Sequence, residues 1–170
     1  METRSAFVAS RDFVKARAMA KRSELIARIT GKHDGVLSLA EVRRAVQPGA
    51  ECYIGCRAVP LERIVGSEGR AGDFSKSFLP KREFLRSRWE RVDQAYHDGK
   101  VLPPVRLIEV GGMYFVRDGN HRVSVARSHK VAYIDAEISR MMVDETFRLD
   151  RSVFDAHRSD SGSSARSGAA

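Results

Sequence analysis

Residues 105–126 read VRLIEVGGMYFVRDGNHRVSVA, and this stretch decides the fold that the sequence predicts. Apolar and polar residues alternate at its start, as they do in a half-buried strand. A Gly-Gly pair typical of a hairpin turn follows, and a second apolar run leads through a polar turn into a helical pattern. The predicted elements are a strand at 105–110, a turn at Gly111-Gly112, a strand at 113–116, a turn at 118–122 and a helix at 123–129. The sequence therefore predicts a β-hairpin that runs directly into a helix.

The polar turn, Asp118-Gly119-Asn120-His121-Arg122, has residues suited to binding phosphate. A helix that starts at such a turn presents free backbone N–H groups and the positive end of its dipole. Gly119 lets an anion approach the backbone closely, and Asn120 and His121 add donors. Arg122 adds a cation with bidentate geometry for phosphate. Asp118 would repel a phosphate unless it binds Mg²⁺ or caps the helix.

A structural interpretation of the same turn stays open at this point. Asp-Gly-Asn is also a plain turn, in which Asp118 or Asn120 caps the helix that follows. His121 would then be a hydrogen-bonded structural histidine. The residue types alone do not separate these two interpretations.

The rest of the chain mixes further helices and strands, so the expected class is α+β. The other predicted elements are a helix at 5–30, a short helix at 39–46 with Ser38 and Glu41 as a capping box, a strand at 53–59, a strand-to-loop segment at 60–65, an exposed glycine-rich loop at 66–73, a helix from Pro80 to His97, a strand at 132–138 and a short helix from Met141 to about Ala156. The apolar stripe expected in the first helix is Phe7, Val8, Phe13, Val14, Met19, Leu25, Ile26 and Ile29. The stripe expected in the Pro80 helix is Phe84, Leu85, Trp89, Val92 and Tyr96, with Trp89 in the core.

These elements suggest four segments along the chain. We expect a basic helical extension at 1–50, the main domain at 51–140, a C-terminal helical segment at 141–158 and a disordered, low-complexity tail at 159–170.

The composition predicts a soluble protein with a basic surface. The chain has 170 residues, of which 42% are hydrophobic and 31% charged, and its net charge is +8. This charge favours contact with polyanions such as nucleic acid, nucleotide phosphates or a membrane surface. The basic residues of the first helix are Arg11, Lys15, Arg17, Lys21, Arg22 and Arg28, and they either contact DNA or a membrane surface or form a solvated face.

The chain shows no secretory signal and no apolar run of about 20 residues, so no membrane span is expected. It has two cysteines, Cys52 and Cys56. On a strand they would share one face at a separation of about 13 Å, too far for a disulfide, so we expect free, partly buried thiols. A single C-x3-C pair is a poor metal signal. These features favour a reducing, cytoplasmic location.

The run 102–105 together with 114–126 resembles the ParB/sulfiredoxin superfamily, in which a proline-containing segment leads into a hairpin, a Gly-x-x-Arg turn and an alanine-containing helix. Residues 59–64 resemble the opening strand of that family, and the likeness covers about residues 52–138. The resemblance implies a ParB/sulfiredoxin-like mixed sheet with packed helices in a bacterial-type protein. The Asp-Gly-x-His-Arg version is closer to the kinase-like and uncharacterised members than to partitioning ParB proteins.

The resemblance also implies roles for particular residues. Nucleotide phosphates would lie on Gly119, Asn120, His121 and Arg122, with Arg70 as a second contact. In kinase-like members an acidic residue after the first strand acts as a base, and Glu68 is the candidate here. Sulfiredoxin has a catalytic cysteine within the turn, where this chain has Asn120 and His121, so sulfinic-acid reduction is not expected. Partitioning ParB proteins continue into a helix-turn-helix domain, whereas only about 30 residues follow Ile138 here, so centromere clamping is not expected.

Two function classes follow. The first is a nucleotide-binding protein, a Mg²⁺-dependent NTPase or phosphotransferase that uses ATP or CTP, with Asp118 holding the metal and Glu68 as the base. The second is a ParB-like module of the partitioning or nuclease type, which binds DNA through the basic first helix without nucleotide chemistry. A sensor or scaffold that binds nucleotide and changes partners is a variant of the first that the sequence does not separate.

Overall fold

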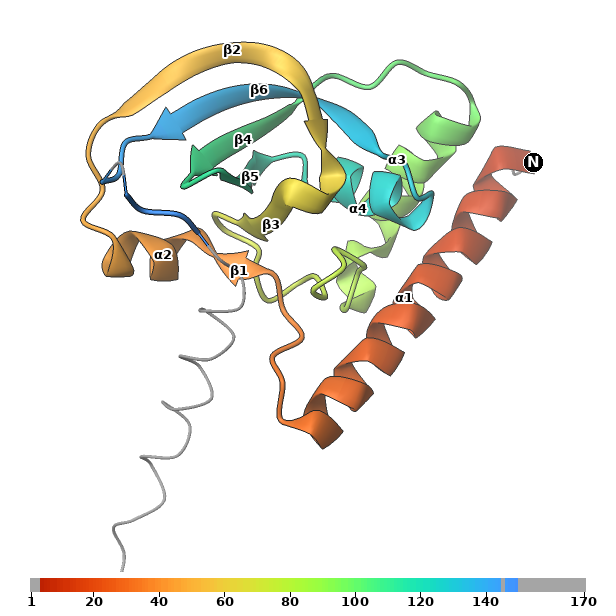
Figure 1. Cartoon of the computed structure of the whole chain (residues 1–170). Coiled ribbons are helices and arrows are strands. Elements are labelled where there is room, and N and C mark those ends of the chain that lie inside the picture. Colours follow the sequence, from red (N-terminus) through yellow and green to blue (C-terminus); the bar gives the residue numbers. More distant parts are fainter. Residues whose placement is uncertain (1–3, 145, 150–170) are drawn as a thin grey trace, which may run out of the picture.

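The structure, a computed structural model, describes residues 4–144 and 146–149 and combines helices with one six-stranded sheet (Figure 1). In chain order the elements are α1 (Arg4–Thr30), β1 (Leu37–Ser38), α2 (Leu39–Ala45), β2 (Glu51–Pro60), the 3-10 turn η1 (Leu61–Arg63), β3 (Ile64–Ser67), the 3-10 turn η2 (Glu83–Leu85), α3 (Arg86–His97), β4 (Val105–Val110), β5 (Met113–Asp118), α4 (Asn120–Ser128) and β6 (Tyr133–Met141). The strand order is β1-β3-β5-β4-β6-β2. The expected α+β class, with a mixed sheet, packed helices and an N-terminal helix, is confirmed.

The predicted hairpin forms the middle of the sheet. Strands β4 and β5 pair antiparallel and turn between Val110 and Met113. Strand β3 runs parallel to β5 on one side, and β6 runs parallel to β4 on the other. Strand β2 adds antiparallel to β6 at one edge. Both hairpin strands are therefore interior strands, which explains why most of their residues are apolar.

Each face of the sheet has its own apolar core, because successive side chains of a strand point to opposite sides. Tyr114 and Val116 of β5 pack on one face with Val123 of α4. Phe115, the residue between them, packs on the other face with Leu39 of α2. Helices α4 and α2 thus cover opposite faces.

Helix α1 forms an outer layer that packs on α3 and α4 through mostly small side chains. The ring of Phe13 meets the buried ring of Trp89 edge-on, with 5.6 Å between the ring centroids. Ala9, Ala16 and Ala20 are the other buried residues of α1, and helical spacing puts them on the same face as Phe13. The prediction that Trp89 lies in the core is confirmed.

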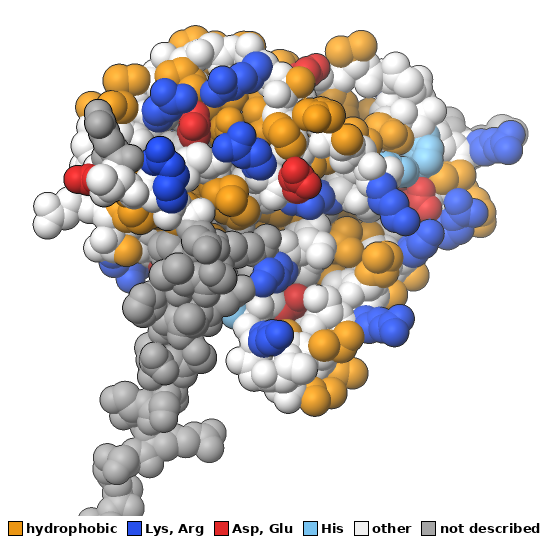
Figure 2. All heavy atoms as spheres, viewed as in Figure 1, with side chains coloured by type: hydrophobic (Ala, Val, Ile, Leu, Met, Phe, Trp, Pro, Cys, Tyr) orange, Lys and Arg blue, Asp and Glu red, His pale blue; other side chains and the backbone are white. Residues whose placement is uncertain are grey.

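The prediction of which apolar residues of α1 are buried is wrong for most of them. Phe13 is buried, but six of the large apolar residues are exposed: Phe7, Val14, Met19, Leu25, Ile26 and Ile29. Small side chains let two helices approach closely, and this packing brings the alanine face of α1 against α3. Hydrophobic side chains consequently lie among Lys and Arg side chains on the outer side of α1 (Figure 2).

Helix α3 begins later than predicted, at Arg86, and not at Pro80. Pro80 instead takes part in an isolated antiparallel bridge with Phe74, and η2 precedes the helix. Phe84 and Tyr96, two members of the predicted stripe, are exposed. Phe84 lies in η2, before the helical periodicity begins, which explains why the stripe fails there.

The segments flanking the sheet also differ from expectation. The predicted capping box is absent, because Ser38 makes no side-chain hydrogen bond to the start of α2. Ser38 instead belongs to β1, which pairs with β3 and extends the sheet. The loop expected at 66–73 starts only at Glu68, since Gly66 and Ser67 are buried in β3.

Edge strand β2 carries both cysteines. Cys52 and Cys56 are free, as predicted, but both are exposed. The pairing of β2 with β6 shifts register between Tyr53 and Gly55, so the simple alternation assumed from the sequence does not hold there.

The short helix predicted from Met141 is not found in the described residues. Met141 ends β6, and residues 142–144 and 146–149 contain no helix. The rest of that segment and the predicted tail at 159–170 lie outside the described residues. Within the described chain, none of the helices combines the length and the apolar character that a membrane span requires.

Gly66 generates a prediction about the sheet. A Cβ atom at this position would lie 2.3 Å from Cδ1 of Phe115 and 2.5 Å from the carbonyl oxygen of Leu37. We expect Gly66→Ala to lower the free energy of unfolding by about 1–3 kcal/mol, because the buried neighbours must move. Urea denaturation measures the change. Gly69→Ala is the matched control, since no atom lies within 4 Å of its added Cβ. Equal stability of the two variants would contradict the predicted clash.

Candidate functional site

A cleft of about 470 Å³ opens at the N-terminal end of α4. It is lined by Gly69, Arg70, Arg88, Val92, Leu102, Pro103, Arg117, Asp118, Gly119, Asn120, His121 and Arg122. Six of the seven residues predicted for the site therefore lie around one cleft. The seventh, Glu68, is not among the lining residues.

The passage from β5 into α4 requires glycine. Gly119 has φ of 97° and is the only residue between the last residue of β5 and the first residue of α4. A Cβ atom there would lie 2.7 Å from Cγ1 of Val105 in the neighbouring strand. At a position with left-handed backbone and no space for a side chain, glycine is the one residue that fits without strain. Helix α4 thus starts at Asn120, three residues before the predicted start.

The first turn of α4 has no side-chain cap and no acidic residue. Its first hydrogen bond runs from the N–H of Val123 to the carbonyl oxygen of Gly119. The N–H groups of Asn120, His121 and Arg122 precede this bond and have no partner within the helix. These groups and the positive end of the helix dipole are arranged to bind an anion.

Arg122 is occupied in holding the turn together. Its guanidinium donates to the carbonyl oxygens of Pro103 and Pro104 and pairs with Asp118, where Nη2 lies 2.7 Å from Oδ2. Its side chain is only 15% exposed. Arg122 therefore ties the segment before β4 to the turn and neutralises Asp118, so its charge is already compensated before any ligand binds.

His121 is a neutral group at physiological pH. Burial lowers the pKa of His121 to about 4, and the charges of Arg88 and Arg70 act in the same direction, while Asp73 opposes them. The imidazole packs edge-on against Phe74, with 5.8 Å between the ring centroids. Its Nδ1 atom has no hydrogen-bond partner among the described residues, and neither does Oδ1 of buried Asn120. Both polar atoms are thus buried at the start of α4 without a protein partner, which is uncommon in folded proteins.

The positive charge of the cleft comes mainly from Arg88 and Arg70. Arg88 lies on an exposed face of α3 and makes no ion pair with the described residues. Arg70 pairs with Asp73 through Nη1 and Oδ2, which are 3.1 Å apart. The sequence interpretation missed Arg88, because its only signal is one basic residue in a charged helix about 30 positions before the turn.

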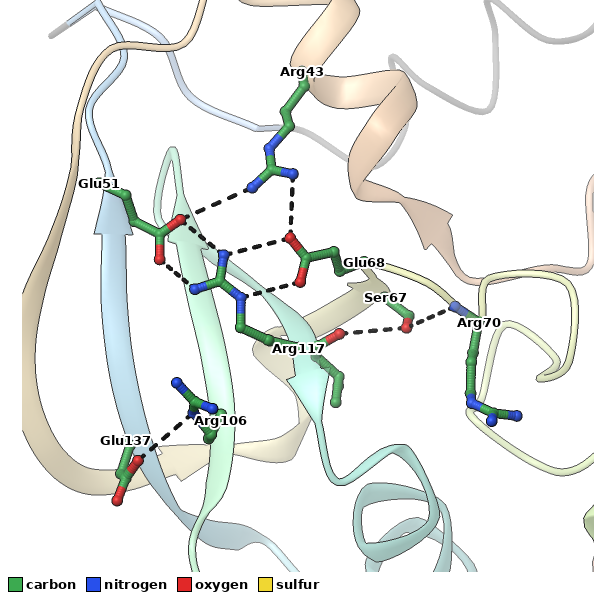
Figure 3. A network of polar contacts seen from close by, with 9 residues as sticks. Arg43, Glu51, Ser67, Glu68, Arg70, Arg106, Arg117 and Glu137 are labelled. Carbon is green, nitrogen blue, oxygen red and sulfur yellow. Dashed lines mark hydrogen bonds and ion pairs between the residues drawn. The ribbon is translucent and has the colours of Figure 1, made fainter.

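Glu68 belongs to an ion-pair network beside the cleft (Figure 3). The guanidinium of Arg117 lies between the carboxylates of Glu68 and Glu51, and Arg43 of α2 contacts both acids. The distance from Nε of Arg117 to Oε2 of Glu68 is 3.0 Å. The hydrogen bond from Arg117 holds the pKa of Glu68 below its ordinary value, and the charges of Arg117 and Arg43 add to this effect. A carboxylate held in this way is a weaker base than a free one.

Arg127, the other arginine near the turn in sequence, points away from the cleft. Its guanidinium donates to the carbonyl oxygens of Leu61 and Ile64. It anchors α4 to η1 and β3 and is not one of the lining residues.

Comparison with known proteins gives one structural likeness. The chain is similar to a sulfiredoxin from Arabidopsis thaliana known from its crystal structure, with 17% sequence identity and a TM-score of 0.32. The match covers 61% of this chain and 96% of the sulfiredoxin. No family model matches the sequence, and neither does any curated protein. Similarity at this level does not indicate which residues act.

The charges around His121 can be tested by NMR titration of its imidazole. We expect a pKa of about 4, which Arg88→Ala raises and Asp73→Asn lowers, because they remove a nearby cation and a nearby anion. The folded-state pKa lies below the unfolded value of about 6.5, so the stability contributed by neutral His121 is complete above that value and declines as pH falls toward 4. A pKa that both variants shift in the same direction would contradict this assignment.

Proposed function

We propose that the cleft at the start of α4 binds the phosphate groups of a nucleotide. The observation that supports this most strongly is the uncapped helix start, where the N–H groups of Asn120, His121 and Arg122 face a basic cleft. Anions bind at such helix ends because the N–H groups and the helix dipole act together.

The size and lining of the cleft suit a nucleotide better than a lone phosphate. Its volume of about 470 Å³ is within the range of small-molecule sites. Arg70 and Arg88 supply positive charge on one part of the wall. Val92, Leu102 and Pro103 supply an apolar part, against which a base or a ribose can pack. We therefore infer a ligand with both anionic and apolar portions, such as ATP or CTP.

The cleft offers Mg²⁺ a single carboxylate ligand. Asp118 is the one carboxylate among the residues that line the cleft. One of its oxygens is paired with Arg122, while the side chain is 56% exposed. Mg²⁺ commonly binds one or two carboxylates together with phosphate oxygens and water. Asp118 is consequently the residue that would hold Mg²⁺ in a nucleotide complex.

Hydrolysis or phosphoryl transfer would need a base in addition to this binding site. Glu68 is the candidate, but Arg117 and Arg43 hold its carboxylate next to the cleft. To act on a bound nucleotide, Glu68 would have to leave these partners. Nucleotide binding is therefore the function that the geometry supports best, and catalysis is a further step within the proposal.

Removal of Arg88 tests the binding proposal. We expect Arg88→Ala to weaken Mg-ATP or Mg-CTP binding by about tenfold or more, because a hydrogen bond to a charged group contributes roughly 1.5–3 kcal/mol. Isothermal titration calorimetry measures this change. Arg91→Ala is the matched control, because it removes the same charge from the exposed part of α3 outside the cleft. Absence of nucleotide binding by the unchanged protein, or equal losses in the two variants, would overturn the proposal.

Contact of α1 with duplex DNA is the second candidate. The exposed basic residues of α1 are Arg4, Arg11, Lys15, Lys21, Arg22 and Arg28. Phosphate contacts release counterions, so the affinity would fall steeply as salt rises. We expect charge removal at Lys21 and Arg22 to reduce both the affinity and its salt dependence in fluorescence anisotropy, while Arg88→Ala leaves both unchanged. Absence of DNA binding at low salt would exclude this candidate.

A further inference from the structure

Four metal-ligating side chains from three helical segments meet on the side of α3 that faces α1. Their ligand atoms all lie within 4.8 Å of one another. The four, here called the His–Asp cluster, are Asp12 of α1, Asp93 and His97 of α3, and His129 directly after α4. None of them lines the cleft proposed to bind nucleotide. Figure 2 shows His and acidic side chains side by side near the N-terminal half of α1.

The atoms that meet are those that commonly bind metals. The Nε2 atom of His97 lies 3.1 Å from Oδ2 of Asp12 and 3.3 Å from Oδ2 of Asp93. The Nε2 atom of His129 lies 2.6 Å from Oδ1 of Asp93. Bonds of about 2.0–2.1 Å to a tetrahedral ion place neighbouring ligand atoms about 3.3 Å apart. Small side-chain movements therefore convert the cluster into a tetrahedral ligand set.

Asp93 gives an independent indication of a bound cation, because one of its oxygens is buried without a hydrogen bond from the described residues. Its side chain is completely buried, and burial of a carboxylate is costly unless the charge is compensated. One oxygen faces His129, but Oδ2 has no hydrogen-bond partner among the described residues. This oxygen lies 3.3 Å from Nε2 of His97 without making a hydrogen bond to it, at the place where the side chains of His97 and Asp12 converge. A cation bound there would satisfy it.

The surroundings hold the imidazoles in place and leave a path for an ion. The ring of Tyr96 stacks on His129, with 4.4 Å between centroids and 19° between planes. Asp93 and His97 are one helical turn apart, so α3 presents both to the same side. Asp12 and His129 also line a cavity of about 280 Å³ between α1 and the end of α4.

We propose that the His–Asp cluster binds one divalent transition-metal ion, with Zn²⁺ the best match. Two imidazole nitrogens and two carboxylate oxygens form a mixed set typical of Zn²⁺ and unlike the all-oxygen sets of Mg²⁺ and Ca²⁺. Four protein ligands fill a tetrahedral shell, so the site is structural and not open to substrate. The ion connects α1 to α3 and to the end of α4.

Titration of the full-length chain with Co²⁺ and Zn²⁺ tests this proposal. The experiment uses the Cys52→Ser, Cys56→Ser background, because two exposed thiols are a competing site. We expect one Co²⁺ per chain with the visible absorption of tetrahedral coordination, displacement of Co²⁺ by Zn²⁺ and a higher Tm with Zn²⁺. His97→Ala is expected to weaken binding more than about a hundredfold, since even changes outside the ligand shell cost 10–100-fold.

Asp12→Asn is the second ligand variant, at a partly exposed position where loss of folding is not expected. Circular dichroism confirms that each variant is folded. His33→Gln is the matched control, because it removes a histidine outside the cluster and should leave binding unchanged. The proposal is overturned if no stoichiometric Co²⁺ binding occurs in the cysteine-free background, or if both ligand variants bind as tightly as that background.

Discussion

The left-handed backbone at Gly119 is the constraint on which the rest of the site depends. Because no further residue separates β5 from α4, the direction of the strand sets the direction of the helix start. Val105 of the neighbouring strand occupies the space that a side chain would need. The N–H groups of the first helical turn therefore have a position fixed by the centre of the sheet. The proposed anion site therefore needs no flexible loop to form it.

The arginines of the site divide into two groups that the sequence does not distinguish. Arg122 and Arg117 lie in or beside the turn, but protein acceptors occupy both. Apart from Asp118, which pairs with Arg122 from four residues away, these acceptors are distant in the chain: Pro103 lies 19 residues from Arg122, and Glu51 lies 66 residues from Arg117. Arg88 is distant from the turn in sequence and faces the cleft. Proximity in sequence thus identifies the turn, whereas the tertiary fold decides which cations are available to a ligand.

The contrast between neighbours in sequence and neighbours in the fold also explains how much of the fold could be predicted. The hairpin and the helix after it follow from short-range signals, the strand alternation and the glycines at 111, 112 and 119. The packing face of α1 could not be predicted, because the helix carries large apolar residues on one side and a row of alanines on the other. Hydrophobicity favours the former, but close packing against Trp89 selects the alanines. Glu68 is a candidate base only through the family resemblance, and the fold reveals that Arg117 and Arg43 pair with it.

Helix α3 connects the two proposed sites of the molecule. Arg88 and Val92 line the cleft, while Asp93 and His97 contribute to the His–Asp cluster. Between them, Trp89 packs against Phe13 of α1 and donates a 2.9 Å hydrogen bond from Nε1 to Oγ of Ser124 in α4. A displacement of α1 would therefore act on α3 and α4 together, and these helices supply the cation and the N–H groups of the cleft. The long first helix is thus part of the support for the proposed phosphate site, because the cleft keeps its shape only while α3 and α4 keep their relative position.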